Sequence, residues 1–514
     1  MVSYTQSPLL ASLRRKTWEP PADLRRYLCN QLILGLEQYY VHLPQKRAGF
    51  AIDPVQALTL LRESDGKGYL RSLLRIVASL RDRHTTLQLG APWTNLIAYV
   101  PFIIERVAVN GQPRYLLSKR LYGYTDIPVG ATISHWNGVP IDLYVNGLAD
   151  ETQGANDPAR LRLAVANLTV RPLAYLLMPS EDWVTVTYYG TDGALRTVST
   201  PWRYFVSAPL QSMGSASLVG EAAALEGLDK LLLLTNRFER DAAPEVTLRR
   251  AGLVTEDPFR YGTRATISGP VGYLRIFNFD TDPTQFVNTT ARILAGLPQD
   301  KLIVDIRNNP GGQIPAGQKL LRLLTDKPLD PAPVAFRSTE STLRVSQLGY
   351  FFLWHRSIAL RTTTGMDFSQ SFPLSTYQDV PDYRYPGKVA LIIDALCYST
   401  SDFFSADFSD NRVGIIVGVD PTTGGGGANV WTWDFLAQTA ASVGGGPLPL
   451  PGGYNFNISV RRCLRTGVNA GIPVEDFGIP ADFVRELTLA DVLGDNADLI
   501  NFVAAKLSAG AGPG

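Results

Sequence analysis

The sequence contains few of the residues that build metal centres or disulfide frameworks. Among its 514 residues are only three cysteines and four histidines. The cysteines (Cys29, Cys397 and Cys463) are odd in number and form no Cys-x-x-Cys pair, which argues against a disulfide framework and against a zinc site. Four histidines are too few for a His-rich metal centre. We therefore expect no metal and no other cofactor.

Charged residues are also scarce, and the two signs balance. They make up 18% of the chain, with 48 Lys and Arg against 47 Asp and Glu. This balance lacks the basic excess of nucleic-acid-binding proteins. No apolar run reaches the roughly 18 residues of a membrane-spanning helix, so no membrane insertion is expected. Arg14, Arg15 and Lys16 follow the short N-terminal apolar patch, the reverse of a secretory signal. The sequence as written predicts a cytoplasmic protein; a trimmed N-terminus would also fit the periplasm or secretion.

The first half of the chain predicts two units of different type. Residues 24–41, 54–64 and 69–81 repeat apolar residues at a spacing near that of a helix, so a helical unit is expected over residues 1–90. Residues 91–205 contain short β-type runs broken by Gly and Pro, which indicate a small mixed α/β domain.

The second half predicts an α/β core. Residues 206–264 begin with small residues and continue with polar ones, which favours an insertion or linker with weak order. Residues 265–514 alternate helical patterns with apolar runs suited to buried parallel strands. These runs are 272–279, 301–306, 388–394 and 413–419. Sheets of this type bind ligands at the carboxyl ends of their strands.

The strand at 301–306 leads into a glycine turn, Asn308-Asn309-Pro310-Gly311-Gly312, before a helix. The glycines allow backbone N–H groups to point outward, and the helix N-terminus adds positive potential, so the turn suits an oxyanion hole or an anion site. A tight turn without a ligand fits equally well. No Lys-Ser or Lys-Thr follows the glycines, which excludes a phosphate-binding P-loop.

The strand at 388–394 leads into Ser399-Thr400-Ser401-Asp402 and an amphipathic helix. A serine at such a turn is presented as a nucleophile, and the N–H of the next residue faces an oxyanion. The alternative is a capping box, in which Ser399 caps the helix and Asp402 closes the box.

A nucleophilic serine needs a base, and the sequence restricts the choice. No lysine lies between Ser399 and Ala505, so a local Ser-Lys dyad is excluded and the histidines remain. His84 lies at a helix-to-strand junction beside Asp82 and small hydroxyl residues, as an accessible base would. The other three histidines have apolar or strand surroundings typical of structural residues (His42, His135 and His355).

Four signatures, in the same order along the chain, resemble the C-terminal-processing (tail-specific) serine peptidases. The resemblance is closest to the His-dependent branch that includes the tricorn protease core. It spans about residues 20–505, without the insertion. The signatures are Leu80–Thr85; Val129–Ile133 with Asn137–Ile141; Gly272–Ile276 with Leu302–Gly312; and Ser399–Asp402 with Val474–Asp482.

The resemblance implies a fold and an activity. The fold would be multidomain α/β: an N-terminal helical unit carrying the His motif, a PDZ-like domain and a crotonase-like (ClpP-like) catalytic core. The activity would be hydrolysis of peptide bonds in a peptide or unfolded protein, with C-terminal ends selected by the PDZ-like domain. The formation of homo-oligomers is compatible with this activity. The implied site comprises Ser399 as nucleophile, His84 as base, Glu475 as the acid, and Gly311, Gly312 and Thr400 at the oxyanion hole.

The chain departs from the family pattern at two positions. The lysine-dependent branch has Lys in a Thr-x-Gly-Lys-Gly loop, but here the loop reads Thr423-Gly424-Gly425-Gly426-Gly427. Either a Ser-His-acid mechanism operates or the protein is inactive. Arg83 also stands where the tricorn branch has a small hydroxyl residue. Asp476 is the alternative to Glu475 as the acid, and residues 424–427 are expected to form a surface or mobile loop.

Two non-catalytic hypotheses remain. One is an inactive member of the fold that binds an apolar small molecule or a peptide, with aromatic residues supplying the site. Retention of Ser399, His84 and Glu475 argues against it, because a binding protein has no need of all three. A scaffold organised by the PDZ-like domain explains least. The aromatic residues are Phe351, Phe352, Trp354, Phe403 and Phe404.

Overall fold

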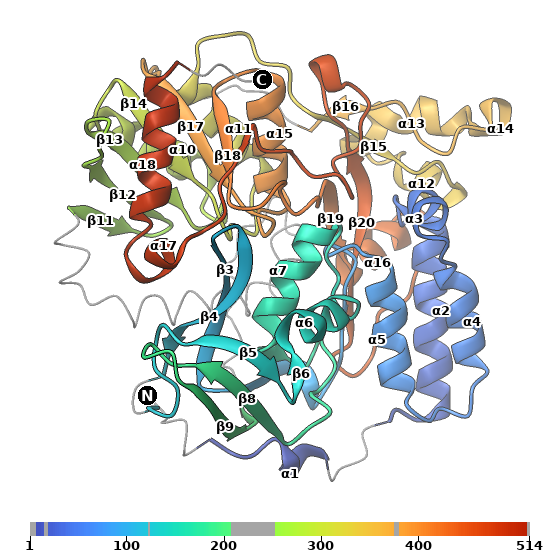
Figure 1. Cartoon of the computed structure of the whole chain (residues 1–514). Coiled ribbons are helices and arrows are strands. Elements are labelled where there is room, and N and C mark those ends of the chain that lie inside the picture. Colours follow the sequence, from blue (N-terminus) through green and yellow to red (C-terminus); the bar gives the residue numbers. More distant parts are fainter. Residues whose placement is uncertain (1–6, 15–18, 122–123, 207–251, 375–379, 511–514) are drawn as a thin grey trace.

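The computed structural model describes residues 7–14, 19–121, 124–206, 252–374 and 380–510 (Figure 1). The structure contains both helices and sheets, so the mixed α/β fold expected from the sequence is confirmed. The finer assignment of its parts as PDZ-like and crotonase-like stays a prediction. In the described ranges, no helix is both long and apolar enough to cross a membrane.

The N-terminal unit is helical, and its main helices pack side by side (Figure 1). Helix α4 (Pro54–Arg62) begins at a side-chain cap: the Asp53 carboxylate accepts hydrogen bonds from the Val55 and Gln56 N–H groups. The helices are α1 (Ala11–Arg14), α2 (Ala22–Gln38), α3 (Leu43–Phe50), α4 (Pro54–Arg62) and α5 (Tyr69–Ser79). The segment after α5 carries His84.

The next unit is built on an antiparallel sheet of order β3-β4-β5-β8-β9, with β6 paired to β5. Strands from the same part of the sequence form a smaller sheet of order β10-β2-β7. The strands are β2 (Leu96–Tyr99), β3 (Phe102–Val109), β4 (Gln112–Arg120), β5 (Thr132–Trp136), β6 (Val139–Pro140), β7 (Val170–Pro172), β8 (Trp183–Tyr189), β9 (Leu195–Pro201) and β10 (Arg203–Val206); the helices are α6 (Ile141–Ala149) and α7 (Asp157–Asn167).

A seven-stranded sheet of order β11-β12-β13-β14-β17-β18-β21 forms the core, parallel from β13 to β21. Alternate residues face opposite layers: Ile303 packs with Leu499 of α18, whereas Val304 belongs to the core with Phe404 of α15. Burial on both faces explains why these strands read as continuous apolar runs. The elements are β11 (Leu253–Glu256), β12 (Phe259–Arg264), β13 (Val271–Ile276), β14 (Lys301–Asp305), β17 (Lys388–Ile393), β18 (Ile415–Gly418), β21 (Phe483–Val484), α10 (Pro283–Ala295), α11 (Ile314–Leu324), α15 (Thr400–Asp410), α17 (Leu489–Leu493) and α18 (Ala497–Ser508).

A further sheet joins the N-terminal unit to the core. Its path is β1-β20-β15-β16, and β19 also pairs with β20. Leu87, which follows His84 by three residues in the chain, lies in β1 opposite Phe456 of β20. The strands are β1 (Leu87–Gln88), β15 (Pro333–Phe336), β16 (Phe372–Pro373), β19 (Ala428–Thr432) and β20 (Asn455–Cys463), with helices α12 (Glu340–Val345), α13 (Phe352–Ala359), α14 (Arg361–Thr364) and α16 (Trp433–Ala441) nearby in sequence.

The predicted insertion at 206–264 divides into two parts. Residues 207–251 lie outside the described residues. Strands β11 and β12, by contrast, belong to the core sheet, where β12 pairs antiparallel with β13. The core sheet therefore starts before residue 265.

Candidate active site

Ser399 lies at the turn between β17 and α15, with a backbone φ of 58°. Positive φ is uncommon for a residue with a Cβ and is found where surrounding structure enforces it. The Ser399 side chain makes no capping hydrogen bond to the helix. The capping-box interpretation is therefore wrong, and the strand–turn–helix geometry of a presented serine is what the chain adopts. The side chain is 7% exposed.

The glycine turn after β14 packs directly against Ser399. A Cβ on Gly311 would lie 2.6 Å from the Ser399 Cβ and 2.8 Å from the Thr400 nitrogen, so only glycine fits there. Gly312 has a φ of 136° and an equally close approach to Phe279. The Thr400 N–H is the first of α15, where a helix offers no acceptor. The structure therefore brings the two predicted turns together.

The Gly311 N–H already has an acceptor. It donates to the Asn309 side-chain oxygen at 2.9 Å. The Thr400 hydroxyl in turn donates to the Gly312 carbonyl at 2.6 Å, which fixes the two turns to each other.

His84 is buried next to the turn that carries Ser399. Its ring centroid lies 4.6 Å from that of Tyr398, the residue before Ser399, at an interplanar angle of 53°. The Arg83 N–H donates to the Tyr398 hydroxyl at 3.0 Å, which ties the two segments together. Neither ring nitrogen of His84 has a hydrogen-bond partner among the described residues, so the Ser399–His84 bond of a triad is not formed.

Burial sets the protonation state of His84. Loss of hydration lowers its pKa to about 4, with the charge of Asp82 opposing this and that of Arg83 adding to it. The imidazole is therefore neutral near pH 7, the form in which a histidine accepts a proton.

Glu475 lies in a different set of contacts from those expected. Its Oε1 accepts a hydrogen bond from the Lys46 ammonium at 2.8 Å, and its Oε2 lies 3.6 Å from Nε2 of His42. None of the hydrogen bonds described for Glu475 reaches His84. Burial raises the pKa of Glu475, as does Asp82, while Lys46 opposes the rise.

Lys46 is the residue that sequence reasoning missed. It lies on α3, is fully buried, and its ammonium also binds Asp476 and the Arg81 carbonyl. A lysine on an N-terminal helix gives no local signal that it lies in the core beside residues near position 475. The carboxylates around it raise the pKa of Lys46 against the effect of burial.

His42, Asp82 and Glu475 offer ligand atoms within 4.8 Å of one another. Both oxygens of Asp82 accept hydrogen bonds from the chain, and the Lys46 ammonium already supplies positive charge at Glu475. A second cation would meet repulsion from Lys46. The donor set therefore fits an ion-pair network and not a metal centre.

The glycine loop 424–427 is buried, so the expectation of a surface or mobile loop is wrong. Its N–H groups face the buried Asp402 carboxylate, with the Gly426 N–H donating at 2.7 Å. A Cβ on Gly426 would lie 2.1 Å from the Tyr398 ring. Gly426 is the position at which the lysine-dependent branch has Lys, and here the Tyr398 ring takes that space.

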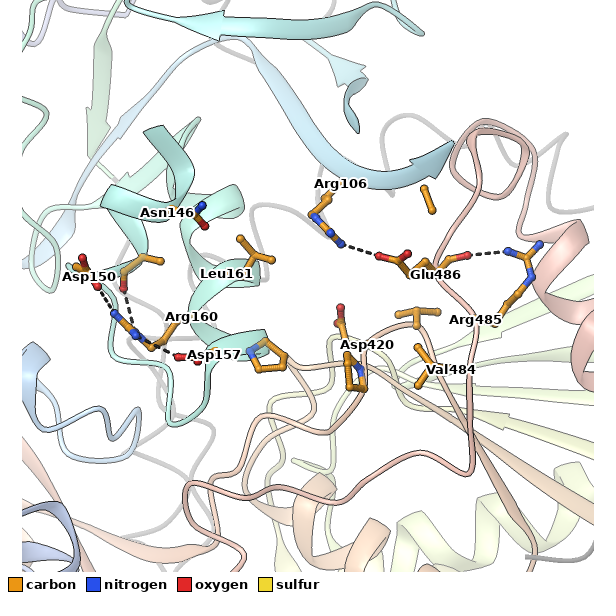
Figure 2. A pocket seen from close by; sticks show the side chains of 15 residues that line it. Arg106, Asn146, Asp150, Asp157, Arg160, Leu161, Asp420, Val484, Arg485 and Glu486 are labelled. Carbon is orange, nitrogen blue, oxygen red and sulfur yellow. Dashed lines mark hydrogen bonds and ion pairs between the residues drawn. The ribbon is translucent and has the colours of Figure 1, made fainter. Parts of the chain in front are cut away.

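A cavity of about 750 Å³ lies between the second unit and the core, and is lined by none of Ser399, His84 and Glu475 (Figure 2). Its charged groups pair with one another, as Arg106 does with Glu486 at 2.8 Å. Asp420 connects the cavity to the turn between β17 and α15, because its Oδ2 accepts a hydrogen bond from the Ala395 N–H at 2.9 Å. Prominent lining residues are Arg106, Asn146, Arg160, Leu161, Asp420 and Val484.

The close packing of Tyr398 on the glycine loop gives a first prediction. Gly426→Ala places a methyl group against the Tyr398 ring, so we expect a loss of stability of about 1–3 kcal/mol from overpacking and a displaced Tyr398. Urea unfolding measures the loss. Gly349→Ala is the matched control, because a Cβ there meets nothing within 4 Å; an equal effect in both variants would contradict the prediction.

Asp402 gives a second prediction, on pH. Burial raises its pKa to about 7, although Thr423 and the loop N–H groups oppose this. The folded chain thus holds a proton that the unfolded chain releases near pH 4, so this contribution to stability is full below about pH 4 and is lost as pH rises through about 7. We expect the stability of wild type relative to Asp402→Asn to fall between about pH 4 and about pH 7. Identical pH dependence of their unfolding free energies would overturn this.

Comparisons with known proteins bear on the family and the fold of the chain. Residues 270–452 match the model of peptidase family S41. None of the curated proteins is significantly similar in sequence. Among solved structures, mature CPAF superposes with a TM-score of 0.71 at 17% identity, over 96% of this chain and 98% of that chain. Mature CPAF complexed with lactacystin gives 0.68 at 17% identity, over 95% and 99%.

The tricorn protease is also among the matches, with a TM-score of 0.40 at 13% identity, over 95% of this chain and 37% of that chain. That score is too low to assign the chain to a branch. The likeness to CPAF, at its low identity, shows a shared fold. Together with the match of residues 270–452 to family S41, which supports a peptidase function, it confirms that the chain resembles the C-terminal-processing serine peptidases.

Proposed function

We propose that the protein hydrolyses peptide bonds of proteins or peptides through an acyl-enzyme formed on Ser399. The observation that carries the proposal is the meeting of three distant segments. The presented Ser399 packs on Gly311, and His84 lies against Tyr398, the neighbour of Ser399. A serine, a neutral imidazole and backbone N–H groups at one place are the parts that acyl transfer requires.

The mechanism follows from these parts. His84 takes the Ser399 proton as the serine oxygen attacks the scissile carbonyl, and the resulting imidazolium then protonates the leaving amine. Water, deprotonated by the same histidine, hydrolyses the acyl-enzyme. The Thr400 N–H and an N–H of the Gly311–Gly312 turn stabilise the oxyanion, each worth about 3 kcal/mol. Because the Gly311 N–H donates to Asn309, its use requires that bond to exchange for the oxyanion.

We assign the acid of the triad to Glu475, whose Oε2 has no hydrogen-bond partner among the described residues. This role requires Oε2 to turn toward His84 while Oε1 keeps its bond to Lys46. Asp476 is less suited, since Lys46 and Gln45 both bind its carboxylate. Lys46 is not the base, because two carboxylates keep its ammonium charged.

The alternative of an apolar-ligand binder loses its support. Four of the five aromatic residues that suggested it are buried in the hydrophobic core, where they pack on one another and on neighbouring side chains. Only Phe352 is largely exposed. The cavity between the second unit and the core has charged residues throughout its lining, among them Arg106, Arg160 and Glu486.

Labelling with a fluorophosphonate probe tests the peptidase proposal. We expect an adduct on Ser399 in wild type and at least about a 100-fold slower reaction in His84→Ala, because general-base assistance is worth about that much. Mass spectrometry of the modified peptide locates the adduct. His135→Ala is the control, as His135 contacts Ser134 in the second unit. A folded wild type that does not react, or an adduct on Ser401, would refute the assignment.

We further propose that the second unit selects C-terminal ends of substrates at the cavity beside β3 and α7. The cavity offers arginines at both sides, Arg106 and Arg160, whose carboxylate partners a substrate carboxylate would replace. Paired peptides with a free or an amidated C-terminus test this. We expect kcat/KM to be about tenfold higher for the free acid, since one charged contact is worth about 1.5–3 kcal/mol. Equal rates, with peptides acetylated at the N-terminus as reference, would exclude such selection.

A further inference from the structure

The carboxylate of Asp82 holds the segment that carries His84. It is fully buried, and its Oδ1 accepts the His84 N–H at 2.8 Å. Its Oδ2 accepts hydrogen bonds from the Thr85 hydroxyl at 2.8 Å and from the Ser459 hydroxyl on β20 at 2.9 Å. One side chain therefore fixes the backbone of His84 and ties it to the core sheet.

Asp82 and Glu475 also differ in charge state: against the effect of burial, His42, Lys46 and His84 lower the pKa of Asp82, whereas burial raises the pKa of Glu475. Glu475 has the Lys46 ammonium at 2.8 Å, whereas no ion pair in the described part of the chain involves Asp82. Its partners are neutral hydroxyl and N–H groups, which stabilise a carboxylate without cancelling its charge. An imidazolium formed in a buried site needs an anion nearby, because an unpaired buried charge is costly.

We propose that Asp82 is the positioning residue of His84: it fixes the histidine backbone, and its negative charge stabilises the imidazolium formed when Ser399 is deprotonated. The proposal rests on the proposed function and deepens it. Glu475 then supplies the hydrogen bond that orients the ring and keeps its bond to Lys46, and Asp82 supplies the larger part of the stabilising negative charge. The pKa of His84 is consistent with this, since Asp82 is the charge that raises it.

Asp82→Asn separates charge from hydrogen bonding. The amide oxygen still accepts the His84 N–H, and the amide nitrogen donates to the Thr85 and Ser459 hydroxyls, which also act as acceptors. Other groups around His84 also influence its titration. They are Asp82, Arg83, Tyr398 and His42, with Lys46, Glu475 and Asp476 beyond His42.

The measurement is an NMR titration of the histidine ring carbons in the full chain, with His84→Gln used to assign the signal. Only four histidines contribute. We expect Asp82→Asn to lower the His84 midpoint by about one unit or more, a loss of about 1.4 kcal/mol per unit. Arg83→Gln should move it upward, because the guanidinium opposes the imidazolium. Glu475→Gln should move it less than Asp82→Asn does.

Three results would overturn the proposal: an unchanged midpoint in Asp82→Asn, a larger shift in Glu475→Gln, or a downward shift in Arg83→Gln. If Asp82→Asn does not fold, a downward shift of about one unit or more in Glu475→Gln would still assign the stabilising charge to Glu475 and overturn the proposal. Fluorophosphonate labelling separates the two levels of inference. If wild type does not react but the midpoints shift as expected, the peptidase proposal fails and the pairing of Asp82 with His84 stands. If wild type reacts, we expect Asp82→Asn to react about tenfold more slowly at neutral pH, in step with its midpoint shift.

Discussion

The joining of the segment after α5 to strand β20 is the interaction on which the site depends. Thr86 and Asn457 exchange backbone hydrogen bonds, and β1 continues the pairing at Leu87. Without this contact the helical unit would carry His84 on a free connection. With this contact, the segment that carries His84 is held against the core that also carries Ser399. The cost of ordering so long a loop grows only slowly with its length, so a few buried bonds are sufficient to hold it.

The same region concentrates buried charge. Asp82, Lys46, Glu475 and Asp402 are fully buried, and the three carboxylates all act on the Tyr398 hydroxyl. Such groups stabilise a fold only when each has partners, and removal of one partner is more damaging than removal of both. The network therefore couples the integrity of the N-terminal unit to that of the core. It also surrounds His84 with fixed charges whose sum decides how readily the ring takes up a proton.

The sequence predicted those features that short-range patterns control. The helices of the first unit, the buried parallel strands and the two turns at Gly311 and Ser399 follow from apolar spacing and glycine placement. Long-range features were missed. Lys46 and its partner Glu475 are separated by 429 positions, and nothing local marks either as a buried ion pair. Strands β11 and β12 were assigned to the insertion because their composition resembles a polar linker, while their pairing to β13 depends on the whole sheet. The roles of Ser399, His84 and Glu475 stay proposals.

The packing of Tyr398 against Gly426 bears on how the two catalytic designs of the family can interconvert. A lysine introduced at Gly426 would need the volume that the aromatic ring already fills. A chain could not gain the lysine first, nor lose the ring first without opening a void beside His84. The two positions must change together. A bulky residue at position 426 therefore requires a smaller residue at position 398, so volume couples the two positions.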